Sequence, residues 1–153
     1  VLTAEQAAKY YDKAKIHVAP SKTLAQGYSA LTMLDLSSGD VEVILSEISD
    51  VINNVTTGLV TYSIRNAEIE GVHINICNGK IVVSENTKLD AIKGILSNVD
   101  INEKEIITII YGKDVNNDEL TNIQNFIKEN YPSLEMDIIC GKQEVYSYIL
   151  SVE

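Results

Sequence analysis

The sequence has few of the residues on which secreted, membrane-spanning and metal-stabilised small proteins depend. Its two cysteines, Cys77 and Cys140, are too few for a disulfide scaffold and wrongly spaced for a zinc ribbon, which favours a reducing cytoplasm. No apolar run approaches the ~18 residues of a membrane-spanning helix. The chain opens with VLTAEQ, which is neither a signal peptide nor a methionine start. We therefore expect a cytoplasmic location and an excised fragment or processed chain.

Positive charge is scarce as well. Twelve basic residues stand against twenty-two acidic ones, a net charge of −10, and Arg65 is the only arginine. Nucleic acids and anionic lipids are bound through Lys and Arg, so neither is expected as a partner. Residues 1–36 carry four basic and three acidic residues, a net +1, whereas residues 37–153 carry eight basic and nineteen acidic residues, a net −11. The acidity either serves solubility alone or makes the later part the contact surface for a basic partner.

The sequence also lacks the short motifs of nucleotide-binding and hydrolytic sites. It contains no GxxxxGK[ST] phosphate loop, no GxGxxG, no GxSxG and no HExxH. We therefore expect no ATP site and no catalytic residue within these 153 residues.

One histidine–cysteine pair has the residue types of a zinc site but not the spacing. His73 and Cys77 share a face of an expected strand and lie roughly 13 Å apart along it, too far for one ion. Only His17 and Cys140 remain as further ligands. An incidental histidine and a small, buried cysteine explain the pair better than zinc.

Residues 114–118 (DVNND) begin like a calcium-binding loop. The sixth position of that loop is Glu119, where the turn needs glycine, and the twelfth is Asn125, where a bidentate glutamate is needed. Asn116 and Glu119 are better explained as a capping pair that begins a helix. No metal site is expected.

What the sequence does contain is the composition of an ordinary folded protein. Apolar residues make up 45% and charged residues 22% of the 153 residues, enough to form a core in one domain or two small lobes. Residues 1–58 are mostly of helical pattern. We expect a helix capped by Thr3, a short strand at residues 15–19, a helix over residues 23–34, and a helix capped by Asp40 whose buried stripe consists of Val41, Ile44, Leu45, Ile48, Val51, Ile52 and Val55.

The pattern changes after Gly58 to alternating strands and helices. We expect strands at residues 59–64, 72–77, 80–84, 105–111, 136–139 and 146–152, with helices beginning after Thr87 and over residues 117–130. Asn78-Gly79 predicts a two-residue hairpin turn. The order strand, helix, strand near the end predicts a βαβ unit. The fold class is therefore α/β, with an incomplete mostly helical lobe (residues 1–58) before a complete lobe with a mixed sheet (residues 59–153).

A few polar residues and glycines are candidates for function. Glu68, Glu70 and Glu144 are expected in loops or strand ends of the acidic lobe and are candidates for partner binding. Arg65 ends a strand and is expected either to form an internal ion pair that braces the hinge or to contact a ligand. Gly71 is expected to be structural, at the turn near Arg65. Gly58 marks the change of pattern and is expected to be structural.

Four segments in order resemble one known family. They are residues 22–31 (KTLAQGYSAL), 57–65 (TGLVTYSIR), 108–115 (TIIYGKDV) and 146–153 (YSYILSVE). Together they resemble the C-terminal region of the kinase subunit of bacterial fatty acid kinase, a family also called dihydroxyacetone-kinase-like. The likeness covers essentially the whole chain.

The resemblance implies a fold related to DegV proteins and a role without catalysis. In that family ATP and magnesium bind an upstream domain, another upstream domain forms the homodimer, and the C-terminal region docks a DegV-family fatty-acid-binding subunit with a basic surface. The bound fatty acid is then phosphorylated to an acyl-phosphate for phospholipid synthesis. Residues 140–145 (CGKQEV) do not match the loop with which lipid-binding DegV proteins hold a carboxylate, so docking is expected rather than fatty acid binding.

Two other functions remain open. The chain is alternatively a DegV-like carrier of fatty acid or another small molecule, which would copurify with its ligand. The remaining alternative is an autonomous enzyme, which an ATPase assay with magnesium would detect.

Overall fold

The computed structural model describes residues 1–63 and 72–153. The chain divides into two compact units, Val1–Val55 and Thr56–Glu153, called unit 1 and unit 2 below. Strand β1 begins at Thr56, so Gly58 lies inside a strand and not at the boundary between patterns.

Unit 1 consists of three helices: α1 (Leu2–Ala8), α2 (Leu24–Thr32) and α3 (Val41–Asn54). The expected Asp40 cap is confirmed, because its side chain accepts a hydrogen bond from the backbone N–H of Glu42. Thr23 caps α2 in the same way, by accepting a hydrogen bond from the backbone N–H of Gln26. The Thr3 cap is wrong: helix α1 begins at Leu2, and no side chain of the described residues caps it.

Two further expectations for unit 1 fail. The predicted strand at residues 15–19 is absent, since no described strand lies beside this segment to complete a ladder. The predicted stripe of α3 is buried only at Ile52 and at Val55 just beyond the helix, while Val41 keeps 44% of its surface exposed. An amphipathic stripe becomes buried only where another layer of the protein lies against it.

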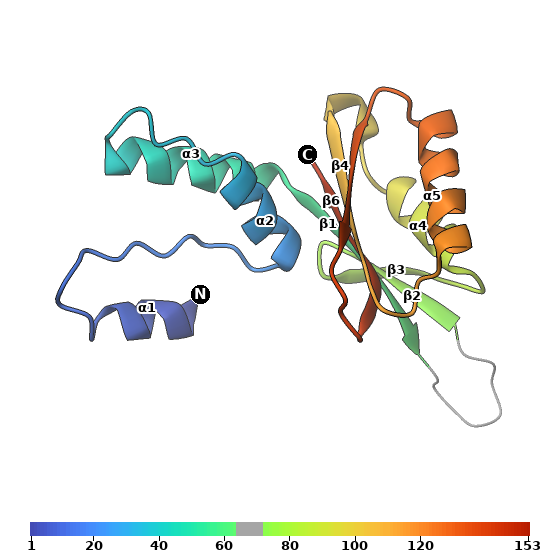
Figure 1. The fold of residues 1–153 in the computed structure, drawn as a ribbon, viewed down its shortest axis with the longest axis horizontal. Helices are drawn as coiled ribbons and strands as arrows, with labels where there is room; N and C mark the ends of the chain where they lie inside the picture. Colours follow the sequence, from blue (N-terminus) through green and yellow to red (C-terminus); the bar gives the residue numbers. More distant parts are fainter. Residues whose placement is uncertain (64–71) are drawn as a thin grey trace. The chain divides into compact units, whose positions relative to one another are not determined.

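Unit 2 is built on a six-stranded mixed sheet in the order β3-β2-β1-β6-β4-β5 (Figure 1). Neighbouring strands are antiparallel except β4 and β5, which are parallel and are joined through helix α5, so the predicted βαβ unit is confirmed. The strands are β1 (Thr56–Ser63), β2 (Val72–Cys77), β3 (Lys80–Glu85), β4 (Ile106–Tyr111), β5 (Glu135–Cys140) and β6 (Tyr146–Val152).

The local signals of unit 2 are confirmed closely. Asn78 and Gly79 have φ angles of 46° and 79°, the left-handed pair that a tight hairpin turn needs. Thr87 caps α4 (Lys88–Leu96), and Asn116 forms a reciprocal capping box with Glu119 at the start of α5 (Asn117–Asn130). A short 3₁₀ helix (Ile101–Glu103) precedes β4.

Helices α4 and α5 lie together on one face of the sheet and bury one continuous core (Figure 1). Its fully buried side chains include Val60, Ile92, Ile95, Ile107, Ile109, Ile123, Ile127, Tyr148 and Leu150. Strand β4 is buried on both faces, as its unbroken apolar run predicted. Gly58 leaves room for α4, because a Cβ atom there would lie 2.7 Å from Cγ2 of Ile95.

Candidate functional site

A polar cluster lies where strand β4 ends and helices α4 and α5 begin. Lys88, in the first turn of α4, is held by both segments that follow β4: its Nζ lies 3.1 Å from Oδ2 of Asp114 and 3.2 Å from Oε2 of Glu119. It also donates a 2.6 Å hydrogen bond to the Asp114 carbonyl. The Lys88 side chain is only 13% exposed. One ammonium group therefore joins the N-terminal ends of the two helices that cover the core.

Strand β6 contributes a third element to this cluster. Ser147, which is buried, donates a 2.7 Å hydrogen bond from Oγ to Oδ2 of Asp114. Burial acts to raise the pKa of Asp114, but the hydrogen bonds from Ser147 and Lys88 outweigh it and hold that pKa below its ordinary value. The cluster is thus a charged network that keeps Asp114 ionised.

Two neutral polar side chains, those of Asn75 and Tyr148, lie on the helix-covered face of the sheet. Asn75 and Tyr148 both align with Val60 on strand β1, so the three side chains form one row across β2, β1 and β6. Asn75 and Tyr148 are 0% exposed, and the Asn75 amide atoms and the Tyr148 hydroxyl have no hydrogen-bond partner among the described residues. Burial, and then the charges of Glu119 and Asp114, raise the pKa of Tyr148.

His73 lies two residues from Asn75 on the same strand. Its ring packs against Tyr62, with 5.2 Å between the ring centroids. Burial, followed by the nearby charge of Lys88, lowers the pKa of His73, so the neutral ring is favoured. In the described part of the chain no three His, Cys, Asp or Glu side chains come together as a metal site would require.

A group of glutamates occupies the opposite end of the sheet. The backbone N–H of Glu105 donates a 2.8 Å hydrogen bond to the Glu153 carbonyl, and that of Glu135 donates a 2.7 Å bond to the Glu105 carbonyl. Three adjacent strand ends therefore place a glutamate at one edge. Within the described residues none of these carboxylates forms an ion pair. We call Glu105, Glu135 and Glu153 the acidic end.

Sequence reasoning missed the acidic end, although a signal for it was present. Glu105 and Glu135 each immediately precede or begin a strand of the βαβ unit, and parallel strands start at the same edge of a sheet. The antiparallel strand β6 must then finish at that edge, where Glu153 follows it.

The site residues predicted from the sequence are only partly described. Glu68, Glu70, Arg65 and Gly71 lie outside the described residues. Glu144 lies in the loop between β5 and β6, has 77% of its side chain exposed, and forms a 2.6 Å ion pair with Lys113. Lys113 neutralises that carboxylate locally, so Glu144 offers a basic partner less negative charge than the acidic end does.

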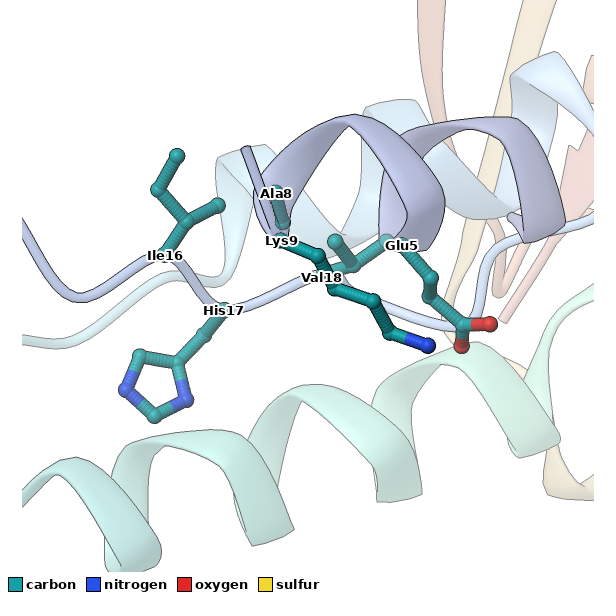
Figure 2. Close-up of a pocket in the computed structure, with 6 residues that line it drawn as sticks. All are labelled: Glu5, Ala8, Lys9, Ile16, His17 and Val18. Atoms are coloured by element: carbon teal, nitrogen blue, oxygen red, sulfur yellow. The ribbon is translucent and has the colours of Figure 1, made fainter. Parts of the chain in front are cut away.

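A shallow depression in unit 1 is lined by helix α1 and the segment that follows it (Figure 2). Glu5 and Lys9 come from the helix and His17 from the segment. Figure 2 shows the His17 ring pointing away from the other two side chains, so the three do not converge on one point. The depression has no arrangement suited to acid–base chemistry.

The described part of the chain contains no helix with the length and apolarity needed to cross a membrane.

The fold identifies the structural class to which this protein belongs. The structure is similar to that of the DegV family protein Cg2579 from Corynebacterium glutamicum, with a TM-score of 0.66, 16% identity, and coverage of 99% of this chain and 69% of that chain. It is equally similar to a fatty-acid-binding DegV family protein from Thermus thermophilus, with a TM-score of 0.66, 12% identity, and coverage of 99% and 65%. The expected DegV-like α/β fold is confirmed.

Sequence comparison gives the family. The model of the FakA-like C-terminal family, which is named for one of the subunits of fatty acid kinase, matches residues 1–153, and the chain belongs to this family. Protein YloV of Bacillus subtilis is 35% identical over 159 residues, which span all of this chain and 28% of YloV. The uncharacterized protein SAR1202 of Staphylococcus aureus is 34% identical over the same length, 29% of its own. The chain thus spans less than a third of the curated relatives that it matches.

Proposed function

We propose that this chain is the non-catalytic C-terminal docking module of a bacterial fatty acid kinase and recruits a DegV-family fatty-acid-binding subunit. The observation that carries the proposal is the family match over all 153 residues. ATP and magnesium bind upstream domains, which phosphorylate the fatty acid to an acyl-phosphate for phospholipid synthesis and form the homodimer. The assembly works in the cytoplasm.

The charge distribution of unit 2 supports docking of a basic surface. Unit 2 carries eight basic and fifteen acidic residues, a net −7, and the acidic end gathers three carboxylates without a cationic partner among the described residues. Such a surface accelerates the encounter with a positively charged partner and disfavours partners of the same sign. Glu105 and Glu135, both exposed, are therefore stronger candidates for the contact than the paired Glu144.

The polar cluster, at the end of the sheet opposite the acidic end, also supports the docking role. Lys88 joins α4 to α5, and Asp114 joins both to β6 through Ser147. These contacts hold the two helices rigidly on the sheet. A preformed surface loses less conformational entropy on binding than a mobile one.

The experiment measures the association rate of the full-length kinase subunit with its purified DegV-family partner at about 50 and 300 mM NaCl, where screening differs strongly. We expect nanomolar-to-micromolar affinity that weakens as salt rises. The double variant Glu105→Lys/Glu135→Lys should slow association about tenfold at low salt. Absence of a complex at low salt would refute the docking role.

A matched variant distinguishes the two ends of the sheet. Glu85→Lys/Glu144→Lys makes the same change of charge, but strand register places Glu85 at the end opposite Glu105. We expect it to slow association less. If it slows association more, the contact lies at the end of the sheet that carries Glu85 and Glu144, and the acidic end is excluded.

The second candidate function is a DegV-like carrier of fatty acid or another small molecule. It is favoured by the similarity to the fatty-acid-binding Thermus thermophilus protein and by the unpartnered polar atoms of Asn75 and Tyr148 in the core. Native mass spectrometry of the freshly purified chain tests it. A retained acyl chain would support the carrier, and the unmodified mass alone would count against it.

A further inference from the structure

Two polar side chains in the core of unit 2 need hydrogen-bond partners that the described residues do not supply. Asn75 and Tyr148 are 0% exposed, and neither the amide atoms of Asn75 nor the hydroxyl of Tyr148 has a partner among the described residues. Burying an amide or a hydroxyl without a hydrogen bond costs free energy, and such groups are nearly always paired with protein or with ordered water. Two exceptions in one row of the sheet therefore indicate a bound molecule.

His73 adds a third group of the same kind. It precedes Asn75 by two residues on β2, so the two side chains lie on the same face of the strand. The Nδ1 atom of His73 is buried and has no hydrogen-bond partner among the described residues. The neutral ring that its lowered pKa favours carries one donor and one acceptor nitrogen, an amide offers both, and a hydroxyl does either. A molecule that pairs with all three groups must both donate and accept hydrogen bonds.

The sheet is irregular at both buried residues. The register of β2 and β3 shifts between Asn75 and Ile76, and the register of β1 and β6 leaves Ser147 unmatched beside Tyr148. Such bulges interrupt the ladder, change the direction of a side chain and are frequent beside functional sites. Helix α4 packs against β1, β2 and β3 and so covers this part of the sheet. The three polar groups are therefore enclosed where the strands depart from regular pairing.

The charges of the polar cluster determine what kind of molecule can bind there. Lys88, Asp114 and Glu119 sum to −1, and the Lys88 ammonium already contacts oxygen atoms of both acidic residues. A bound carboxylate would add a like charge in an enclosed place and would have to compete for Lys88, which is unfavourable. A metal ion is unsuited as well, because the described residues contain no group of three His, Cys, Asp or Glu side chains that could hold one. A small neutral molecule fits best.

We propose that Asn75, Tyr148 and His73 form an internal hydration site beneath α4, which holds water rather than the head group of a fatty acid. Water donates and accepts hydrogen bonds, carries no charge and typically makes about three bonds to buried groups that are otherwise unsatisfied. It thereby completes the polar contacts between the sheet and its covering helix. The same atoms that favour the carrier are then satisfied without a carried ligand.

Removing the hydroxyl alone gives a test by sign. Tyr148→Phe should lower the equilibrium constant for folding of the 153-residue chain about fivefold, because the hydroxyl loses a bond to water, and urea denaturation measures this constant. A hydroxyl without any partner would behave in the opposite way, since its removal relieves a desolvation cost. A constant that rises or stays unchanged would therefore overturn the proposal. Tyr10→Phe, the same substitution at a 91% exposed position, is the control and should have no effect.

The water molecules can also be counted directly, without reference to stability. Oxygen-17 magnetic relaxation dispersion of water detects internal molecules that exchange slowly with the solvent. The double variant Asn75→Leu/Tyr148→Phe replaces both polar side chains by apolar ones of similar shape, and it should lose at least one such molecule relative to the unchanged chain. The Tyr10→Phe control should keep the full number. Equal numbers in the double variant and the unchanged chain would contradict the proposal.

A high-resolution crystal structure of the chain identifies the bound molecule. We expect isolated water density at about 2.7–3.2 Å from the Tyr148 hydroxyl and from the Asn75 amide. An acyl chain or another organic molecule at these atoms would refute the hydration site and favour the carrier. A protein group at the same distance would refute it as well. None of these measurements includes the DegV-family subunit, so failure of the hydration site and failure of the docking role are separate outcomes.

Discussion

Helices α3 and α5 have the same length and similar apolar stripes, but the two units bury them differently. In unit 2 the stripe of α5 is covered, with Ile123 and Ile127 at 1% and 0% exposure. In unit 1 only Ile52 and Val55, near the C-terminal end of α3, are fully buried, whereas Val41 is exposed and the four stripe residues between are half-buried. An amphipathic pattern determines which face of a helix prefers burial, but a second layer must be present to bury it.

The sharpest test of this difference compares one truncation in each unit. Ile127→Ala should lower the free energy of unfolding of unit 2 by about 2–5 kcal/mol, because it removes buried surface and leaves a cavity. Leu31→Ala in the 153-residue chain should change stability by less than about 0.5 kcal/mol, as at other exposed positions. Chemical denaturation monitored by circular dichroism measures both. A large loss for Leu31→Ala would mean that Leu31 is covered in the 153-residue chain.

Replacing a glycine by alanine should lower the stability of unit 2 at one position and raise that of unit 1 at another. Gly58→Ala places a Cβ atom 2.7 Å from Ile95 Cγ2 and 3.3 Å from Leu150 Cβ, so we expect a loss of about 1–3 kcal/mol from overpacking. Gly27→Ala meets Ser21 Oγ at an ordinary 3.6 Å inside α2 and should gain about 0.5–1 kcal/mol from helix propensity. Thermal unfolding of both variants checks this contrast, and equal shifts would contradict it.

The polar cluster makes the stability of unit 2 depend on pH. Lys88→Met should cost about 1 kcal/mol near neutral pH, since Asp114 and Glu119 are partly exposed and lose a shared partner. The lowered pKa of Asp114 makes its stabilising contribution present above the ordinary aspartate pKa of about 4, and lost as pH falls through the lowered value. Urea denaturation from pH 7 to pH 2 should therefore show the two proteins converging at low pH. A constant difference would exclude Asp114 as the cause.

The smallest expected effect concerns His73. Its lowered pKa means that the unfolded chain binds a proton more readily, so His73 destabilises unit 2 as pH falls below the ordinary histidine value of about 6.5. His73→Gln should flatten the stability profile between pH 7 and pH 5. His17→Gln makes the same substitution at an exposed position of unit 1 and is the control. An unchanged profile in His73→Gln would remove this residue from the pH response.

Most helices and strands were predictable because their signals are local. The predicted caps at Asp40, Thr87 and Asn116 act within three residues, and the Asn78-Gly79 turn is fixed by its own backbone angles. The predicted strand at residues 15–19 failed for the complementary reason. A strand is completed by hydrogen bonds to another segment, which local sequence does not supply.

The candidate surfaces depended on contacts between distant parts of the chain. Lys88 meets Asp114 across 26 positions, and Asp114 meets Ser147 across 33. The prediction of Glu144 rested on exposure and charge, which its pairing with Lys113 partly offsets. The acidic end arises because strand order brings Glu105, Glu135 and Glu153 to one edge.

The sequence by itself determined the family, the order of helices and strands in unit 2, the caps at Asp40, Thr87 and Asn116 and the negative charge of the later part, since each depends on neighbouring residues or on simple composition. Only the tertiary structure decided which charges gather, which are neutralised and which apolar faces are covered. Those outcomes depend on which chain segments become neighbours in space, and many pairings are compatible with the same local signals.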